Sequence, residues 1–90
     1  MNIPRYRVSC ESCGVEASLK IASSWTNGDT TELKTYAIVC PTCLPAALRG
    51  ARNRHAACAV ASGERVEPPA VFELAMGRPS HCLLRRADLE

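Results

Sequence analysis

The sequence predicts a small, metal-stabilised α+β domain with a cysteine knuckle, an antiparallel β-hairpin and one α-helix, followed by a C-terminal β extension. Three observations support this fold class. The chain contains two Cys-x-x-Cys pairs, apolar and polar residues alternate between them, and apolar residues recur at helical spacing after the second pair. With 90 residues the chain makes one domain, and a domain of this size often needs a metal or disulfides to stay folded.

The two cysteine pairs, Cys10 with Cys13 and Cys40 with Cys43, are separated by 26 residues. Two thiolates spaced in this way can turn back onto one cation, and two such pairs complete a tetrahedral shell. Gly14 follows the first pair, where a positive φ is useful, and Pro41 favours a turn within the second. We therefore predict one structural Zn²⁺ ion bound by these four cysteines.

The composition leaves the apolar core small. Hydrophobic residues make up 47% of the chain, but 13 of them are alanines, and Ile, Val, Leu and Phe together number 18. Zinc bound to four thiolates contributes on the order of 10 kcal/mol to folding, enough to decide whether the chain folds. The predicted metal is therefore structural.

The cysteines also bear on the cellular compartment. A disulfide framework would need an oxidising compartment, yet residues 1–7 carry no apolar export segment. No apolar run approaches the length of a membrane span. In a reducing cytosol, cysteine pairs favour metal over disulfides, so we expect a cytoplasmic protein with no membrane partner.

The first half of the chain is predicted to form β-strands. We predict a short strand over residues 5–9, a strand over residues 15–21 and another over residues 31–39, joined through the turn signal Asn27-Gly28-Asp29. The last two strands should form an antiparallel hairpin. Its return strand would bring Cys40 beside the first cysteine pair.

The alternation also predicts the faces of the return strand. Leu33, Thr35, Ala37 and Val39 should share the core side, while Tyr36 and Ile38 face away. A C-terminal strand over 71–76 is the expected cover for Tyr36 and Ile38. The alternative is a partner site or a homodimer contact that includes Trp25.

After the second pair the chain reads as a helix from Leu44 to a stop at Ser62-Gly63. Pro45 is tolerated in a first helical turn. The residues of the predicted inner face are spaced by three or four: Leu44, Leu48, Ala51, His55 and Cys58.

The tail is less regular. We expect an extended linker over 64–70, a strand over 71–76 and a turn over 77–80. Residues 81–89 fit either a returning strand or a short helix. The organisation is thus a core over residues 1–63 and an extension over 64–90 packed on it, in a single domain.

These motifs resemble a treble-clef or zinc-ribbon-type zinc finger with four cysteine ligands, in which a Cys-x-x-Cys-Gly knuckle, a hairpin and a Cys-Pro-x-Cys that opens a helix follow one another. The resemblance covers about residues 5–60 and implies the ligands Cys10, Cys13, Cys40 and Cys43. It implies no particular activity, because such folds serve many functions. The whole chain also resembles short uncharacterised zinc-finger proteins of bacterial genomes.

The other metal-ligating side chains favour packing. His55 and Cys58 would share a helix face, and His81 precedes Cys82 directly. Adjacent residues seldom reach one ion together, and a free cysteine is a common small core residue. We therefore expect buried thiols at Cys58 and Cys82 rather than a second metal site.

The charges give only a local argument for nucleic acid. The net charge is +2 with neutral cysteines, and four thiolates with one Zn²⁺ would bring it near zero. The helix segment carries Arg49, Arg52 and Arg54 and no acidic residue, which suits phosphate recognition. An Ala- and Arg-rich composition alone explains the same pattern.

These observations favour a non-catalytic module that binds a macromolecule, either a protein or RNA or DNA through arginines. A four-thiolate zinc has no open position for a substrate, so we expect neither an enzyme nor a small-molecule substrate. The main alternative is an iron electron carrier, because Cys40-Pro41-Thr42-Cys43 is similar to a rubredoxin loop. Against it, the chain is neither acidic nor rich in aromatic residues. A structural subunit of a larger assembly is a third possibility.

Overall fold

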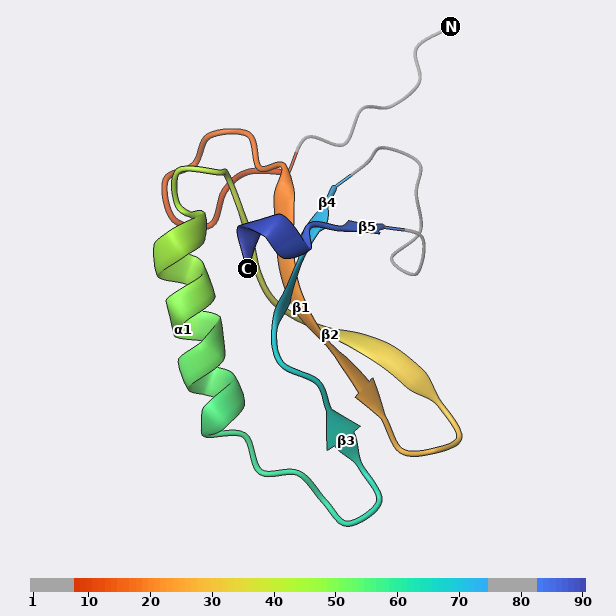
Figure 1. The fold of residues 1–90 in the computed structure, drawn as a ribbon. Coiled ribbons are helices and arrows are strands. Elements are labelled where there is room, and N and C mark those ends of the chain that lie inside the picture. The colour runs from red at the N-terminus through yellow and green to blue at the C-terminus, as the bar shows by residue number, and fades with distance from the viewer. Residues whose placement is uncertain (1–7, 75–82) are drawn as a thin grey trace, which may run out of the picture.

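The computed structural model describes residues 8–74 and 83–90, which form a five-stranded antiparallel sheet with one helix on one face (Figure 1). The elements are strand β1 (Leu19–Thr26), strand β2 (Thr31–Val39), helix α1 (Leu44–Ala56), strand β3 (Arg65–Val66), strand β4 (Ala70–Glu73), strand β5 (Leu84–Arg85) and the 3₁₀ helix η2 (Ala87–Leu89). The strand order is β2-β1-β4-β5, and β3 also pairs with β1. The sheet thus extends beyond the predicted hairpin.

The predicted hairpin is formed by β1 and β2, from the pair Leu19 and Val39 to the pair Thr26 and Thr31. At the turn, Asn27 Oδ1 accepts hydrogen bonds from the amides of Asp29 (2.9 Å) and Thr30 (2.8 Å). The first strand begins at Leu19 rather than at residue 15. Of the predicted strand over 5–9, residues 5–7 lie outside the described residues, and Ser9 forms a single bridge with Glu16.

A β-bulge in β2 overturns the predicted faces of that strand. Ile21 pairs with Ala37 and Ala22 pairs with Thr35, so Tyr36 is an extra residue without a partner in β1. The bulge brings the Tyr36 side chain into the buried core, while Thr35 is exposed. The prediction that Tyr36 faces away from the core was therefore wrong.

The C-terminal strands extend the sheet instead of covering it. β4 pairs with β1 through Leu19–Glu73 to Ala22–Ala70, on the edge opposite β2. The expected cover of Tyr36 and Ile38 by this segment is therefore wrong, and α1 lies against Tyr36 instead. Residues 81–89 combine both predicted alternatives, because β5 is followed by η2, while residues 75–82 lie outside the described part of the chain.

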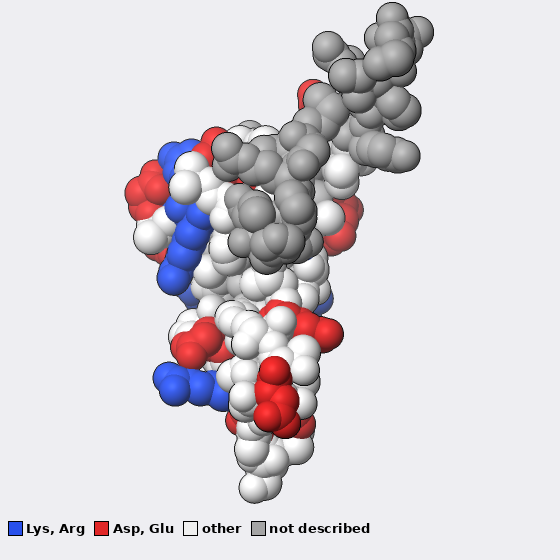
Figure 2. Space-filling view, turned by 90° about the vertical axis from the view of Figure 1, so that its right-hand side faces the viewer, with Lys and Arg blue, Asp and Glu red and all other residues white. Residues whose placement is uncertain are grey.

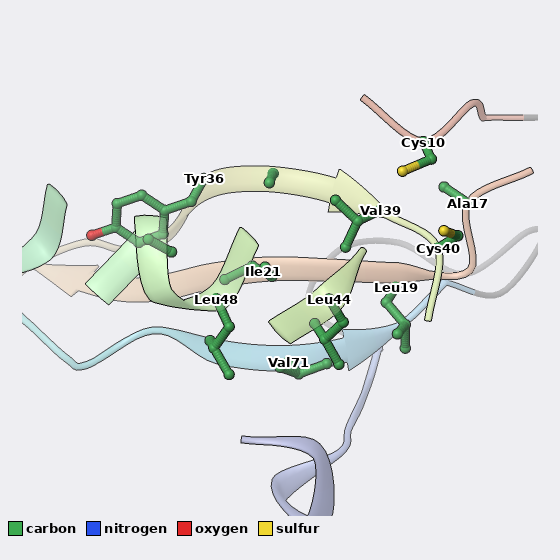
Figure 3. Packing of buried hydrophobic residues seen from close by; sticks show 12 residues of the cluster. Cys10, Ala17, Leu19, Ile21, Tyr36, Val39, Cys40, Leu44, Leu48 and Val71 are labelled. Carbon is green, nitrogen blue, oxygen red and sulfur yellow. The ribbon is translucent and has the colours of Figure 1, made fainter. Parts of the chain in front are cut away.

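The core lies between α1 and the sheet. Leu44, Leu48 and Ala51 of α1 are buried against the sheet, where Ile21 and Val71 have no exposed surface (Figure 3). The helix ends at Ala56, not near residue 62 as predicted, because no helical residue after Ala51 is buried. Without tertiary packing, helical propensity alone does not extend a helix.

The segment after the helix runs along the edge of β1 that lies opposite β2. Glu67 N donates to Ser24 O (2.8 Å), and β3 pairs with Trp25 and Thr26. The Trp25 indole N–H donates to a carboxylate oxygen of Glu64. These contacts hold the predicted linker against the far end of the hairpin.

Candidate metal centre

The first cysteine pair lies in a hydrogen-bonded knuckle. Gly14 N donates to Cys10 O (2.9 Å), and Cys10 N donates to Val15 O (2.6 Å). Gly14 has a φ of +83°, a left-handed conformation that closes the turn and that glycine adopts without strain. The knuckle is joined to the hairpin by Glu11 N, which donates to Ile38 O (3.1 Å).

The second pair lies where β2 passes into α1. Cys43 N donates to Cys40 O (3.2 Å), and Ala47 N donates to Cys43 O (3.1 Å) as the helix begins. Pro45 occupies the first turn of α1. The helix N-terminus therefore starts at this pair, where the positive end of the helix dipole favours anionic sulfur.

The two pairs meet in space, as predicted. The Sγ atoms of Cys10, Cys13, Cys40 and Cys43 all lie within 4.8 Å of one another. The Sγ atoms of Cys13 and Cys40 are 3.6 Å apart. Four sulfurs around one zinc at about 2.3 Å would be about 3.8 Å apart, so this arrangement can hold a metal ion.

The centre lies at one end of the core. Cys10 and Cys40 are buried, with 3% and 5% of their surface exposed, beside Ala17 and Val39 (Figure 3). Cys13 is exposed and Cys43 is half-buried. Cys10 and Cys40 are therefore held by the core, while Cys13 and Cys43 can be reached from solvent. All five cysteines in the described residues, including Cys58, are free thiols.

The local environment gives the thiols different proton affinities. Burial raises the pKa of Cys10, but the backbone N–H groups of Cys40, Cys13 and Ser12 favour its thiolate and lower the pKa to about 6. Hydrogen bonds to the side chains of Cys13, Cys40 and Cys10 raise the pKa of Cys43 to about 12. A bound cation would displace the protons of the protonated thiols, because thiolates are the ligands.

The other candidate ligands do not join a metal site in the described residues. His55 Nε2 lies 3.1 Å from Val66 O, and Cys58 Sγ accepts a hydrogen bond from Lys34 Nζ (3.3 Å). Cys58 is half-buried and lies beyond the end of α1, so the expectation that it is a buried helical thiol was wrong. His81 and Cys82 lie outside the described residues.

The three arginines predicted to contact nucleic acid have different surroundings in the structure. Arg54 Nη2 donates to Tyr36 O (3.2 Å), and its guanidinium lies 5.5 Å from the centroid of the Tyr36 ring. Arg49 and Arg52 are exposed on the helix, three residues apart. On the side of the molecule opposite α1, shown in Figure 2, basic and acidic side chains are interspersed. Arg54 thus has a structural role within the chain.

An open apolar hollow of about 320 Å³ lies beside the second cysteine pair. Its walls come from β1, the start of α1, the end of β4 and the C-terminal segment. The alternation patterns could not predict it, because it depends on where the tail docks. The residues that form it include Leu19, Leu44, Leu74 and Leu89, with Glu73 and Arg86.

Comparisons with known proteins found no relative of the chain. No protein-family model, curated protein or solved structure matches the chain. Within the described residues, no helix is both long enough and apolar enough to cross a bilayer. The cysteine cluster is therefore the observation on which a function can be built.

Proposed function

We propose that the chain is a non-catalytic zinc-binding module of the treble-clef type, in which one Zn²⁺ is bound by Cys10, Cys13, Cys40 and Cys43. The observation that carries the proposal is the set of four sulfur atoms within 4.8 Å of one another. The order of knuckle, hairpin and a second pair at a helix start supports this type of zinc finger. Thiolate ligands suit a reducing compartment, which supports a cytoplasmic location.

The role of the metal is structural in this proposal. Four thiolates fill a tetrahedral shell, so no coordination position remains for a water molecule or a substrate. The ion would tie residue 10 to the start of α1 and so fix the hairpin against the helix. A folded surface held in this way suits binding to a macromolecule rather than catalysis.

The partner in this proposal is a protein. Arg54 donates to Tyr36 O and lies over its ring, so its guanidinium is less available to phosphate, which makes a phosphate backbone the less favoured partner. A pull-down from the native cell, with nuclease treatment and graded salt, tests this choice. Capture that survives nuclease supports a protein partner, and capture that nuclease abolishes supports RNA or DNA.

A rubredoxin-like iron centre is the competing function, because four thiolates at this spacing also suit iron. Purification without added metal, followed by elemental analysis and an absorption spectrum, separates the two. Zinc at one equivalent in a colourless protein supports the proposal. Iron at one equivalent in a red protein would replace it with electron transfer, and no metal at all would overturn both.

A further inference from the structure

One edge of the sheet is open at the hairpin end. Within the described residues, β2 pairs with β1 alone, so its other edge has no strand partner. Asn27 N donates to Thr30 O (3.2 Å), so this carbonyl points towards β1. Because backbone groups alternate along a strand, those of Thr31, Leu33 and Thr35 point away from β1. Residues 31–35 therefore present a row of outward N–H and C=O groups.

The rest of this edge is occupied by the chain itself. Arg54 Nη2 donates to Tyr36 O at the bulge (3.2 Å), and Glu11 N donates to Ile38 O (3.1 Å). A bulge and blocking contacts of this kind normally protect an edge strand from pairing. The bulge and these contacts protect the edge from Tyr36 onward but not residues 31–35. Figure 1 shows that the hairpin end projects away from α1 and from the C-terminal segment.

The side chains on residues 31–35 are complementary to a second copy of themselves. Their sequence, Thr-Glu-Leu-Lys-Thr, has opposite charges placed symmetrically about Leu33. In an antiparallel pair centred on Leu33, Glu32 of each copy lies opposite Lys34 of the other. Leucine then lies opposite leucine, and threonine opposite threonine. Opposite charges facing each other across antiparallel strands stabilise the pair.

The backbone geometry fits the same register. A two-fold axis at Leu33 makes the outward residues Thr31, Leu33 and Thr35 the hydrogen-bonded positions of the pair. About six new backbone hydrogen bonds would form. Glu32 and Lys34 then occupy the non-hydrogen-bonded positions, where side chains across the pair come closest.

We propose that two copies of this chain associate through residues 31–35 of β2, paired antiparallel about a two-fold axis at Leu33. The sheet then continues from one copy into the other, with both helices on the same face. A lysine on an edge strand usually discourages pairing, but here Glu32 of the second copy neutralises it. Lys34 Nζ lies 3.3 Å from Cys58 Sγ, and its three donors allow it to bind a carboxylate as well.

The test is sedimentation of the full-length, metal-loaded protein. So short a strand pair is a small interface, so we expect a dissociation constant between about 10 µM and 1 mM. The reversals Glu32→Lys and Lys34→Glu each place like charges opposite each other twice in the dimer. We expect each to weaken the self-association about tenfold or more.

Mixing the two variants is the decisive measurement. One variant carries two lysines on this segment and the other two glutamates, so an equimolar mixture should form a heterodimer although each variant alone self-associates only weakly. The double variant Glu32→Lys/Lys34→Glu should dimerise like the wild type. Glu16→Lys, an equal charge change at an exposed residue away from the hairpin end, should have no effect.

A backbone variant checks the edge itself. Leu33→Pro removes an outward N–H that β1 does not use, so the dimer should be lost while metal content and far-UV circular dichroism stay unchanged. The proposal is overturned if the wild type remains strictly monomeric at about 1 mM. It is also overturned if the mixture of charge-reversed variants shows no heterodimer, or if the Leu33→Pro variant dimerises normally.

Discussion

Replacing Cys40 with serine should unfold the domain, although the change exchanges one small side chain for another. Only 5% of the surface of Cys40 is exposed, and its sulfur lies 3.6 Å from that of Cys13. It also directly follows β2 and precedes α1, so it couples the sheet to the helix. Serine is a poor ligand for zinc compared with a thiolate.

The expected magnitude follows from comparing the metal with the core. Only Ile21, Val39 and Val71 are large apolar side chains with no exposed surface among the described residues. Burying one such side chain fully contributes about 1.5–3 kcal/mol, and the entropy of ordering the chain opposes it. A structural zinc contributes on the order of 10 kcal/mol, which exceeds the net stability of most small domains. Weakening the site should therefore remove most of the folded population.

The assay is thermal unfolding followed by circular dichroism, with zinc content measured on the same samples. Cys58→Ser is the matched control, because Cys58 is outside the cysteine cluster, and it should keep both the metal and the transition. The wild type treated with a strong chelator should behave like Cys40→Ser. If the Cys40→Ser variant or the chelated protein unfolded cooperatively at the wild-type temperature, the metal would not be what holds the fold together.

Four further substitutions have defined outcomes. Leu48→Ala, in the buried face of α1, should lower the free energy of unfolding by about 2–5 kcal/mol in urea titrations. Gly14→Ala should lower the free energy of unfolding by about 1–2 kcal/mol, because the φ of +83° is unfavourable for a side chain even though no atom crowds it. Gly50→Ala, within α1, should raise the free energy of unfolding by about 0.5–1 kcal/mol. The pKa of Glu90 is lowered first by its hydrogen bonds with Arg85, so its stabilisation is complete above the ordinary value of 4.5 and is lost as pH falls through the lowered pKa. Glu90→Gln should therefore destabilise by about 1 kcal/mol at pH 7 and progressively less below pH 4.5.

Each of these outcomes can fail separately. A Leu48→Ala cost below about 1 kcal/mol would mean that α1 is not packed on the sheet as described. Equal effects of Gly14→Ala and Gly50→Ala would contradict the left-handed turn in the knuckle. A pH-independent difference between the wild type and Glu90→Gln would contradict the ion pair with Arg85.

The features that depend on local residue spacing could be predicted from the sequence. The positions of Cys10 and Cys40 in two Cys-x-x-Cys motifs indicated that their sulfurs would meet, and the structure brings them together. The Asn27-Gly28-Asp29 signal located the hairpin turn, because these residues favour that backbone conformation. The helix was correctly expected from Leu44, since Pro45 suits a first turn.

The features that depend on distant contacts could not be predicted in the same way. The bulge at Tyr36 adds one residue to β2 without interrupting its run of strand-forming residues, so the alternation gave the wrong face. The position of β4 beside β1 depends on pairing across a long stretch of chain, which a periodicity does not encode. The helix ends at Ala56 because packing ends there, although the residues that follow retain helical propensity.

The contact between Trp25 and Glu64 gives the molecule a built-in optical probe. Trp25 is the sole tryptophan of the chain, and it pairs with Glu32 across the hairpin and with Val66 on its other side. Tryptophan emission therefore reports on the hairpin end that lies away from the cysteine cluster. If the cysteine cluster holds the proposed zinc, emission recorded during chelation would reveal how far its removal changes the structure along β1, with no label attached.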